Sequence, residues 1–211
     1  MKPDFRLYLI TGGKPSSGEL LEAVGLALEG GVGAVQLRMK DLPARELLKL
    51  ALRLRELTER YRARLFINDR LDIAIASGAD GVHLGVNGIP PEAARKAAMM
   101  SSQGGQELMI GVSTHSLKEA ESAQKSGADF ITFGPVFDTP SKRIFGPPLG
   151  VSRLAEVVRA VDIPALAIGG IKLGNIKEVI SAGASGAALI SGILGAEDIK
   201  TEAGLFMRAL E

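Results

Sequence analysis

The sequence of 211 residues has no cysteine, no tryptophan and two histidines. Without cysteine there is no disulfide framework, no thiolate metal site and no cysteine nucleophile. The formal net charge is +1, and we expect no nucleic-acid partner because such a surface needs a basic excess. No apolar run approaches the roughly 18 residues of a membrane span, and the N-terminal apolar patch is too short for a signal peptide. These absences favour a globular protein, and we expect a cytoplasmic location.

Glycine, by contrast, is abundant, with 26 residues, or about 12% against a usual value of about 7%. Many glycines lie at the ends of short apolar runs. One pattern recurs at intervals of roughly 50 residues, as GVGAVQLR from Gly31, GADGVHLG from Gly78, GADFITFG from Gly127 and GASGAALI from Gly183. Each copy is typical of a helix-ending glycine, a short turn and a buried strand.

Four further apolar segments lie between these copies, at residues 6–11, 64–68, 108–113 and 164–169. Helical periodicity follows the strands and is clearest at residues 43–61, 90–100 and 116–125, the last with a capping box at its start. Strands that alternate with helices predict a parallel sheet. Eight such units predict closure into a single (β/α)8 barrel, one α/β domain over residues 1–211, with an open doubly wound sheet as the alternative.

In such a barrel the active site lies at the C-terminal ends of the strands. Gln36, Arg38 and Lys40 alternate at one strand end and so share a face. An amide and two cations there suit a diphosphate, although the cations could instead pair with carboxylates. The next strand ends in Asn68 and Asp69. Asp69 could hold a Mg²⁺ that bridges phosphate oxygens, or it could pair with an arginine.

The two histidines have different expected roles. His83 lies within a strand, and we expect an inward, hydrogen-bonded residue of the barrel interior. His115 follows the strand that carries Ser113 and lies at the predicted mouth. It is therefore the candidate general acid–base residue, with a hydrogen-bonded residue at a helix start as the alternative.

The longest irregular segment covers residues 135–150 and contains Thr139, Ser141 and Lys142. A loop this long inside a compact barrel is usually functional or disordered. Its hydroxyls, its cation and its Gly-Pro-Pro stretch predict a lid that closes over a ligand.

Small residues follow the last two strands, among them Gly169, Gly170 and Ser191. Glycines there allow backbone N–H groups to approach an oxyanion closely, as in the usual phosphate cradle of this fold. With the cations on the second strand, two phosphate-binding patches face one mouth. They predict two phosphorylated substrates, or one substrate with phosphates at both ends.

The motifs VQLRMKD, FINDRLD, GVHLG, GVSTHS, GPVFDTPSK and AIGGI occur in this order. Together they resemble the thiamine phosphate synthase family and its relatives, the thiazole tautomerases, from Leu7 to Ser191. The resemblance implies a (β/α)8 barrel that joins an aminopyrimidine methyl diphosphate to a thiazole phosphate and releases diphosphate.

The resemblance also implies roles for individual residues in three groups. The first binds the pyrimidine diphosphate, the second assists departure of diphosphate, and the third closes over the substrates or holds the thiazole phosphate. The first group is Gln36, Arg38, Lys40 and Asn68, with Asp69 as a Mg²⁺ ligand; the second is Ser113, Lys142 and Arg38; the third is Thr139, Ser141, Lys142, Gly169, Gly170 and Ser191.

One position departs from the family. Gly88 stands where the synthases usually carry an aspartate, the second Mg²⁺ carboxylate, and Val86 replaces a glutamine. We expect weaker Mg²⁺ binding, with oxygens from Asp69, Asn87 and the diphosphate.

The departure leaves two alternatives open beside the synthase. One is a metal-independent thiazole tautomerase, acting on a carboxythiazole phosphate through His115. The other is a non-catalytic regulator that binds the same ligands. A homo-oligomer through Met99, Met100 and the C-terminal helix is a further expectation.

Overall fold

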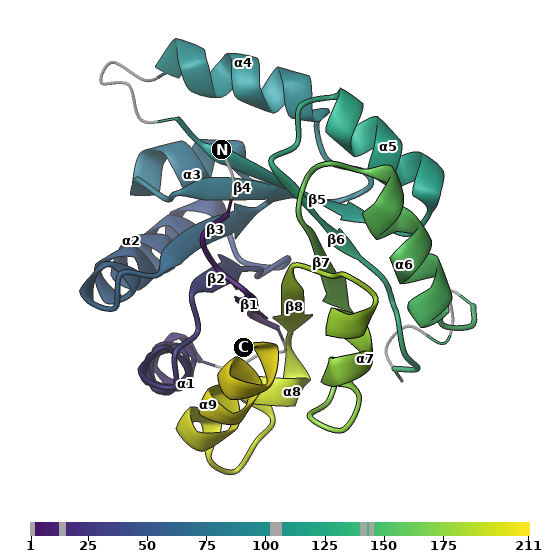
Figure 1. Cartoon of the computed structure of the whole chain (residues 1–211). Helices are drawn as coiled ribbons and strands as arrows, with labels where there is room; N and C mark the ends of the chain where they lie inside the picture. The colour runs from purple at the N-terminus through teal and green to yellow at the C-terminus, as the bar shows by residue number, and fades with distance from the viewer. Residues whose placement is uncertain (1–2, 13–15, 102–106, 140–142, 144–145) are drawn as a thin grey trace.

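The fold is a closed barrel of parallel strands (Figure 1). A computed structural model describes the chain except for residues 1–2, 13–15, 102–106, 140–142 and 144–145. Its strands pair in the order β1 to β8, and β8 closes on β1. The strands are β1 (Leu7–Ile10), β2 (Ala34–Leu37), β3 (Arg64–Asn68), β4 (Gly81–Leu84), β5 (Met109–Thr114), β6 (Phe130–Phe133), β7 (Ala165–Ile168) and β8 (Gly186–Leu189). The predicted (β/α)8 barrel is confirmed, and an open doubly wound sheet is excluded.

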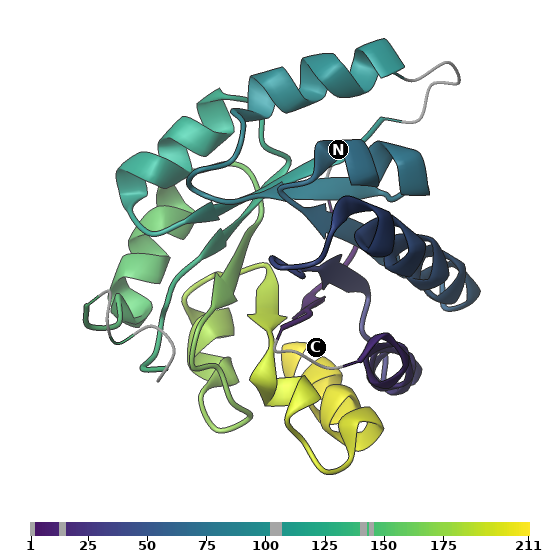
Figure 2. The ribbon, with the colours of Figure 1, turned by 180° about the vertical axis from the view of Figure 1, so that it is seen from behind.

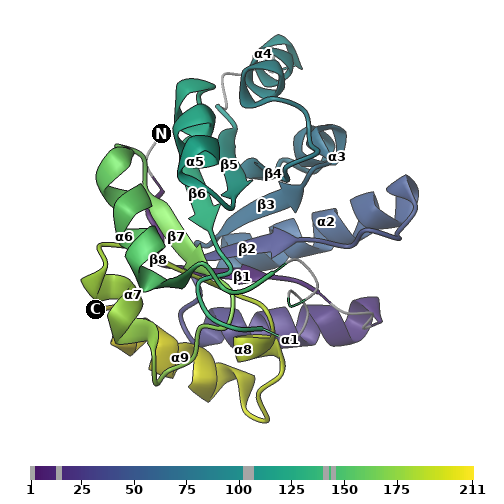
Figure 3. The same cartoon turned by 90° about the vertical axis from the view of Figure 1, so that its right-hand side faces the viewer.

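A helix follows each strand and covers the outside of the barrel (Figure 3). The helices are α1 (Ser17–Glu29), α2 (Ala44–Arg60), α3 (Leu71–Ser77), α4 (Pro91–Ser101), α5 (Leu117–Lys125), α6 (Gly150–Ala160), α7 (Ile176–Ser181), α8 (Ser191–Leu194) and α9 (Ile199–Leu210). The first and last of them, α1 and α9, pack side by side (Figure 2), and Lys200 Nζ lies 2.9 Å from Glu29 Oε2. Among the described helices, none is long and apolar enough to cross a membrane.

The four strands and three helices predicted between the glycine-led repeats begin and end within one residue of the strands and helices in the structure. One local prediction is half right. Ser116 Oγ accepts the backbone N–H of Glu119 (3.2 Å), as a capping box requires. The Glu119 carboxylate, however, accepts the N–H of His115 (2.7 Å) and not that of Ser116. It therefore holds the backbone at the barrel mouth as well as starting α5.

Aromatic rings fill the barrel interior toward the N-terminal ends of the strands. Their centroids lie 5.3 to 5.8 Å apart, in tilted or edge-to-face pairs. The rings belong to Phe5, Tyr8, Phe66 and Phe130. Glycine on the neighbouring strands makes room for them. A Cβ at Gly81 would lie 2.5 Å from the Phe66 ring, and a Cβ at Gly111 would lie 2.4 Å from the ring of Phe130 and 2.6 Å from His83.

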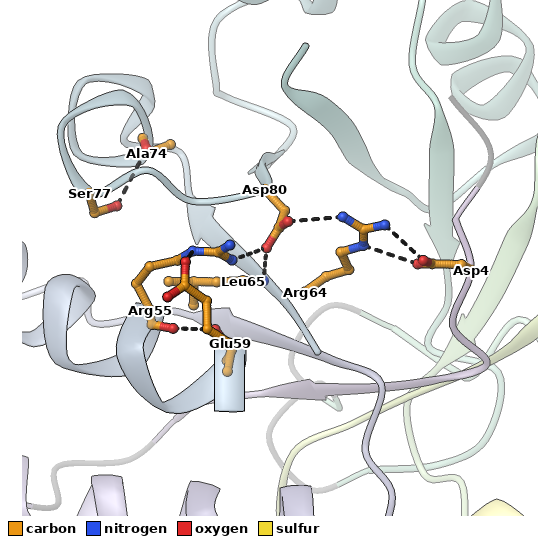
Figure 4. A network of polar contacts seen from close by, with 9 residues as sticks. Asp4, Arg55, Glu59, Arg64, Leu65, Ala74, Ser77 and Asp80 are labelled. Carbon is orange, nitrogen blue, oxygen red and sulfur yellow. Dashed lines mark hydrogen bonds and ion pairs between the residues drawn. The ribbon is translucent and has the colours of Figure 1, made fainter. Parts of the chain in front are cut away.

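A buried carboxylate ties β3, β4 and α2 together at the N-terminal end of the barrel (Figure 4). Asp80 accepts the backbone N–H of Leu65 (2.8 Å), Arg64 Nη1 (3.1 Å) and Arg55 Nη1. Arg64 reaches on to Asp4 (2.8 Å) and holds the pKa of that carboxyl below its ordinary value. This end of a barrel contributes to stability and not to catalysis.

The same arrangement recurs one repeat later. Asp129 accepts the N–H of Ile110 (2.7 Å) and Arg95 Nη2 (2.7 Å). Asp80 and Asp129 are the aspartates of the two GAD segments. The sequence repeat therefore encodes a structural device as well as a strand: each aspartate anchors its own strand to the strand before it.

Candidate functional site

The alternating residues on β2 separate into two environments. Gln36 is 2% exposed in the barrel interior, where its Nε2 donates to Tyr8 Oη (3.0 Å). Arg38 is half-buried beyond the strand end, and its backbone N–H donates to Oγ1 of Thr11 (2.8 Å), the residue that follows β1. Lys40 is exposed. Within the described chain neither Arg38 nor Lys40 forms an ion pair, so the alternative of a structural carboxylate network finds no support there.

Asp69 is fixed at the end of β3 by three hydrogen bonds. Its Oδ1 accepts the N–H of Gly85 (2.7 Å), its Oδ2 accepts Asn68 Nδ2 (2.8 Å), and its own N–H donates to the carbonyl of His83 (2.9 Å). Its φ is 58°, a left-handed conformation that few residues other than glycine adopt. Arg70 pairs with Asp72 (2.6 Å) and not with Asp69. An exposed carboxylate held in an unfavourable backbone conformation is typical of a functional position.

Gly88 lies directly against this carboxylate. A Cβ at Gly88 would be 2.9 Å from Asp69 Oδ1 and 3.1 Å from the carbonyl oxygen of Gly85. A carboxylate at position 88 would therefore stand beside Asp69. No three His, Cys, Asp or Glu side chains gather as a metal site within the described residues. A single carboxylate at Asp69 is compatible with Mg²⁺, because this ion is often bound by one or two protein carboxylates plus substrate phosphates.

Gly88→Asp should make stability depend on Mg²⁺. Without metal, two adjacent carboxylates repel each other. We expect the free energy of unfolding to fall by about 1 kcal/mol, which lowers the melting temperature by about 2–4 °C. Mg²⁺ at millimolar concentration should reverse this loss, because it binds the folded state. Thermal melts with and without Mg²⁺ measure both changes. Gly88→Asn is the matched control: it has the same size without the charge, and an equal Mg²⁺ response there would contradict the prediction.

A chain of polar side chains crosses the barrel between β1, β4 and β5. Tyr8 Oη lies 3.4 Å from His83 Nδ1, and His83 Nε2 lies 3.1 Å from Ser113 Oγ. Tyr8 and His83 are buried, whereas Ser113 is half-buried nearer the mouth. Burial lowers the pKa of His83 to about 3, so the ring is neutral at physiological pH. The prediction of an inward, hydrogen-bonded His83 is confirmed.

His115 is exposed at the C-terminal end of β5, as predicted for a residue of the mouth. Its Nδ1 lies against the carbonyl oxygen of Gly134. A carbonyl only accepts, so Nδ1 carries the proton and, in the neutral ring, Nε2 carries the lone pair. The ring of His115 is therefore held by Gly134 and not by the Ser116 region, and its role in proton transfer stays a prediction.

The segment after β6 is attached to β7 through its backbone. The N–H groups of Val136 and Phe137 donate to the carbonyls of Ile168 (2.9 Å) and Gly169 (3.0 Å). Thr139 is half-buried in this segment. Ser141 and Lys142 lie outside the described residues, so the predicted lid and their roles in it stay predictions.

Gly169 and Gly170 both have positive φ, 95° and 63°. A Cβ at Gly169 would lie 2.6 Å from Pro135, and one at Gly170 would lie 2.5 Å from the carbonyl oxygen of Asp138. Glycine is thus needed here for packing of the β6 segment, a reason that differs from the predicted close approach of an oxyanion. The β7 and β8 ends share the barrel mouth, where Ser191 is exposed as the first residue of α8.

Comparison with known proteins assigns the family. The thiamine monophosphate synthase family matches residues 7–193. This chain belongs to that family. It is 51% identical over 210 residues to a putative thiamine-phosphate synthase of Geobacter sulfurreducens, covering 99% of this chain and 96% of the relative. It is 43% identical to the thiamine-phosphate synthase of Halalkalibacterium halodurans, with the same two coverages.

A solved structure agrees with the family. Thiamine phosphate pyrophosphorylase from Pyrococcus furiosus superimposes with a TM-score of 0.87 at 39% identity, covering 98% of this chain and 95% of the other. The family expected from the motifs is therefore confirmed along nearly the whole chain. The roles of individual site residues are not tested by these comparisons.

Proposed function

We propose that this protein is a thiamine phosphate synthase that joins an aminopyrimidine methyl diphosphate to a thiazole phosphate. Membership of the family supports the reaction. At the site, the proposal rests on two cations at the mouth that form no ion pair within the described residues. Arg38 and Lys40 follow β2 without an ion pair within the described residues, next to the strand that ends in the anchored Asp69. Cations without protein partners suit a polyanionic substrate.

The proposed reaction is dissociative. The bond between the pyrimidine methylene carbon and the diphosphate oxygen breaks, and its electron pair leaves with diphosphate. The electron-rich pyrimidine stabilises the resulting cation, and the thiazole nitrogen then donates its lone pair to form the new C–N bond. Such chemistry needs stabilisation of the leaving charge more than a strong base, and Arg38, Lys40, Ser113 and Lys142 are the proposed donors to diphosphate.

Substrate positioning involves both sides of the mouth. We assign Gln36 and Asn68 to the pyrimidine diphosphate, and Thr139 and Ser141 to closure over the substrates. Gly169, Gly170 and Ser191 are assigned to the thiazole phosphate. A cytoplasmic location and a homo-oligomer stay predictions; Met99 and Met100 are 60% and 79% exposed on α4.

Mg²⁺ is the proposed metal, with Asp69 as its protein ligand and diphosphate oxygens as the others. When bound, it supplies positive charge at the leaving group. Because Gly88 replaces the second carboxylate, we expect the ion to bind mainly together with the substrate.

Formation of thiamine phosphate from both substrates should require Mg²⁺ and stop in EDTA. His115→Ala should lower the rate by less than about 3-fold, since the reaction needs no general base at that position and such a base contributes at least about 100-fold where it is used. Chromatography of thiamine phosphate measures both effects. A full rate in EDTA, or loss of the reaction in His115→Ala, would contradict this assignment.

A thiazole tautomerase is the second candidate, and the geometry of His115 favours it specifically. Its Nδ1 is fixed on Gly134, which leaves Nε2 for proton transfer at the mouth. The wild-type protein in EDTA and the His115→Ala variant decide between the two candidates. A tautomerase should convert a carboxythiazole phosphate in EDTA and lose that activity in His115→Ala. A protein that binds thiazole phosphate but converts neither substrate set would be a regulator.

A further inference from the structure

Tyr8 and His83 form a directed hydrogen-bond chain under the active-site mouth. The chain begins at Gln36, whose Nε2 donates to Tyr8 Oη over 3.0 Å. A phenol has one proton and accepts here from the amide, so its own O–H is left for the neighbour at 3.4 Å, His83 Nδ1. Nδ1 is then the acceptor of the ring. In a neutral imidazole the other nitrogen must carry the proton.

The protonated nitrogen faces Ser113. His83 Nε2 lies 3.1 Å from Ser113 Oγ and 3.4 Å from Thr132 Oγ1. With Nε2 as donor, Ser113 Oγ accepts a hydrogen bond from His83. The hydroxyl proton of Ser113 is then free to be donated to another group. His83 pairs with Gly111 across β4 and β5, and Ser113 lies two residues farther toward the mouth. The proton of Ser113 is therefore available to a ligand that enters from the mouth.

Several features hold the chain in one arrangement. Tyr8, Gln36 and His83 are at most 2% exposed, so water does not compete for their hydrogen bonds. The imidazole stands against the rings of Tyr8 and Phe130, with centroids 5.7 Å away in each case. Gly111 leaves the space that the imidazole occupies. Burial of the imidazole among these rings disfavours its charged form.

We propose that Tyr8 and His83 are positioning residues: they set the Nε2–H tautomer of His83, which turns the Ser113 hydroxyl proton toward the diphosphate group of the substrate. The proposal rests on the proposed function for the identity of that anion. The opposite polarity, with Nδ1–H donating to Tyr8, would make Ser113 donate to the imidazole. Ser113 would then present oxygen lone pairs to a diphosphate, which repel it.

The tautomer can be measured without any substrate. The chain contains two histidines, so ¹⁵N–¹H correlation spectra of ¹⁵N-labelled protein at pH 7 give two ring systems, and His115→Ala identifies the one that belongs to His83. We expect an unprotonated Nδ1 and a protonated Nε2. A protonated Nδ1 would overturn the proposal whatever reaction the protein catalyses.

Tyr8→Phe tests the consequence, since it removes the O–H that Nδ1 accepts and leaves the ring stack. We expect the Kd for inorganic diphosphate with Mg²⁺, measured by calorimetry, and the rate of thiamine phosphate formation to worsen about 10-fold. In a Ser113→Ala background the same substitution should change neither by more than about 2-fold, because the group that the chain positions is gone. An equal effect in both backgrounds would show a merely structural role and overturn the proposal.

Thr58→Val is the control for the loss of a buried hydroxyl. Thr58 is fully buried in α2, outside the barrel interior, and its Oγ1 donates to the carbonyl of Arg55 (3.0 Å). We expect unchanged diphosphate binding and rate in this variant. If the wild-type protein forms no thiamine phosphate, the proposed function fails, and the tautomer and the diphosphate affinities still decide whether the chain positions Ser113.

Discussion

Asp69→Asn should lower the rate of thiamine phosphate formation about 100- to 1,000-fold at millimolar Mg²⁺, the usual effect of losing one interaction that stabilises transition-state charge. The asparagine can still accept the N–H of Gly85, which donates to Oδ1 over 2.7 Å in the native chain. The left-handed backbone at this residue also tolerates asparagine. The variant therefore removes the negative charge and the hydrogen bond from Asn68 Nδ2, and it keeps the link to Gly85 at the β3 end. Initial rates over a Mg²⁺ titration measure the loss, which higher Mg²⁺ should partly restore.

Asp72→Asn is the matched control. It removes a carboxylate three residues away that pairs with Arg70 and is 64% exposed. Its rate should stay within about 2-fold of the native rate, since exposed pairs contribute little. A native rate in Asp69→Asn would show that no metal is needed at this position. An equal loss in both variants would point to the shape of the β3–α3 turn and not to the charge.

The barrel could be predicted because its signals are local and repeated. Each of the four glycine-led repeats, from Gly31, Gly78, Gly127 and Gly183, indicates where a helix ends and a strand begins. Eight strand–helix units leave few ways to bury their apolar faces. Boundaries near Pro43 and Pro91 were accurate because proline is tolerated in the first turn of a helix and not within its interior. Burial of His83 could likewise be predicted from its place inside an apolar strand.

Contacts between distant segments could not be predicted. Alternation placed Gln36 with Arg38, yet the structure buries Gln36 on Tyr8, a partner 28 positions away in the sequence. Gly169 and Gly170 likewise pack on the segment after β6, a contact between two loops that are distant in the sequence. The aspartates at 80 and 129 carried a usable signal, since they repeat with the strands. Their place at the start of the strands, opposite the mouth, gives this signal a structural meaning and not a catalytic one.

Asp80→Ala should lower the free energy of unfolding by about 3 kcal/mol, the usual size of the effect when one partner of a buried ion pair is removed. The side chain is 8% exposed and accepts from two arginines and from the N–H of Leu65. Truncation leaves that N–H without its acceptor and removes one of the two carboxylate partners of each arginine, since Arg55 also pairs with Glu59 and Arg64 with Asp4. For a chain of this size the melting temperature should fall by roughly 6–12 °C, which urea unfolding and thermal melts would measure.

Asp72→Ala separates burial from the ion pair itself. Arg70 Nη2 lies 2.6 Å from Asp72 Oδ2, as short as a strong pair, but the two side chains are 38% and 64% exposed. Its loss should lower the free energy of unfolding by less than about 1 kcal/mol. Equal losses in the two variants would mean that the contact, and not its burial between β3 and β4, determines stability. Because Asp80 lies at the end of the barrel opposite the mouth, the folded Asp80→Ala protein should keep its rate and its Mg²⁺ requirement, whereas Asp69→Asn loses rate while it stays folded.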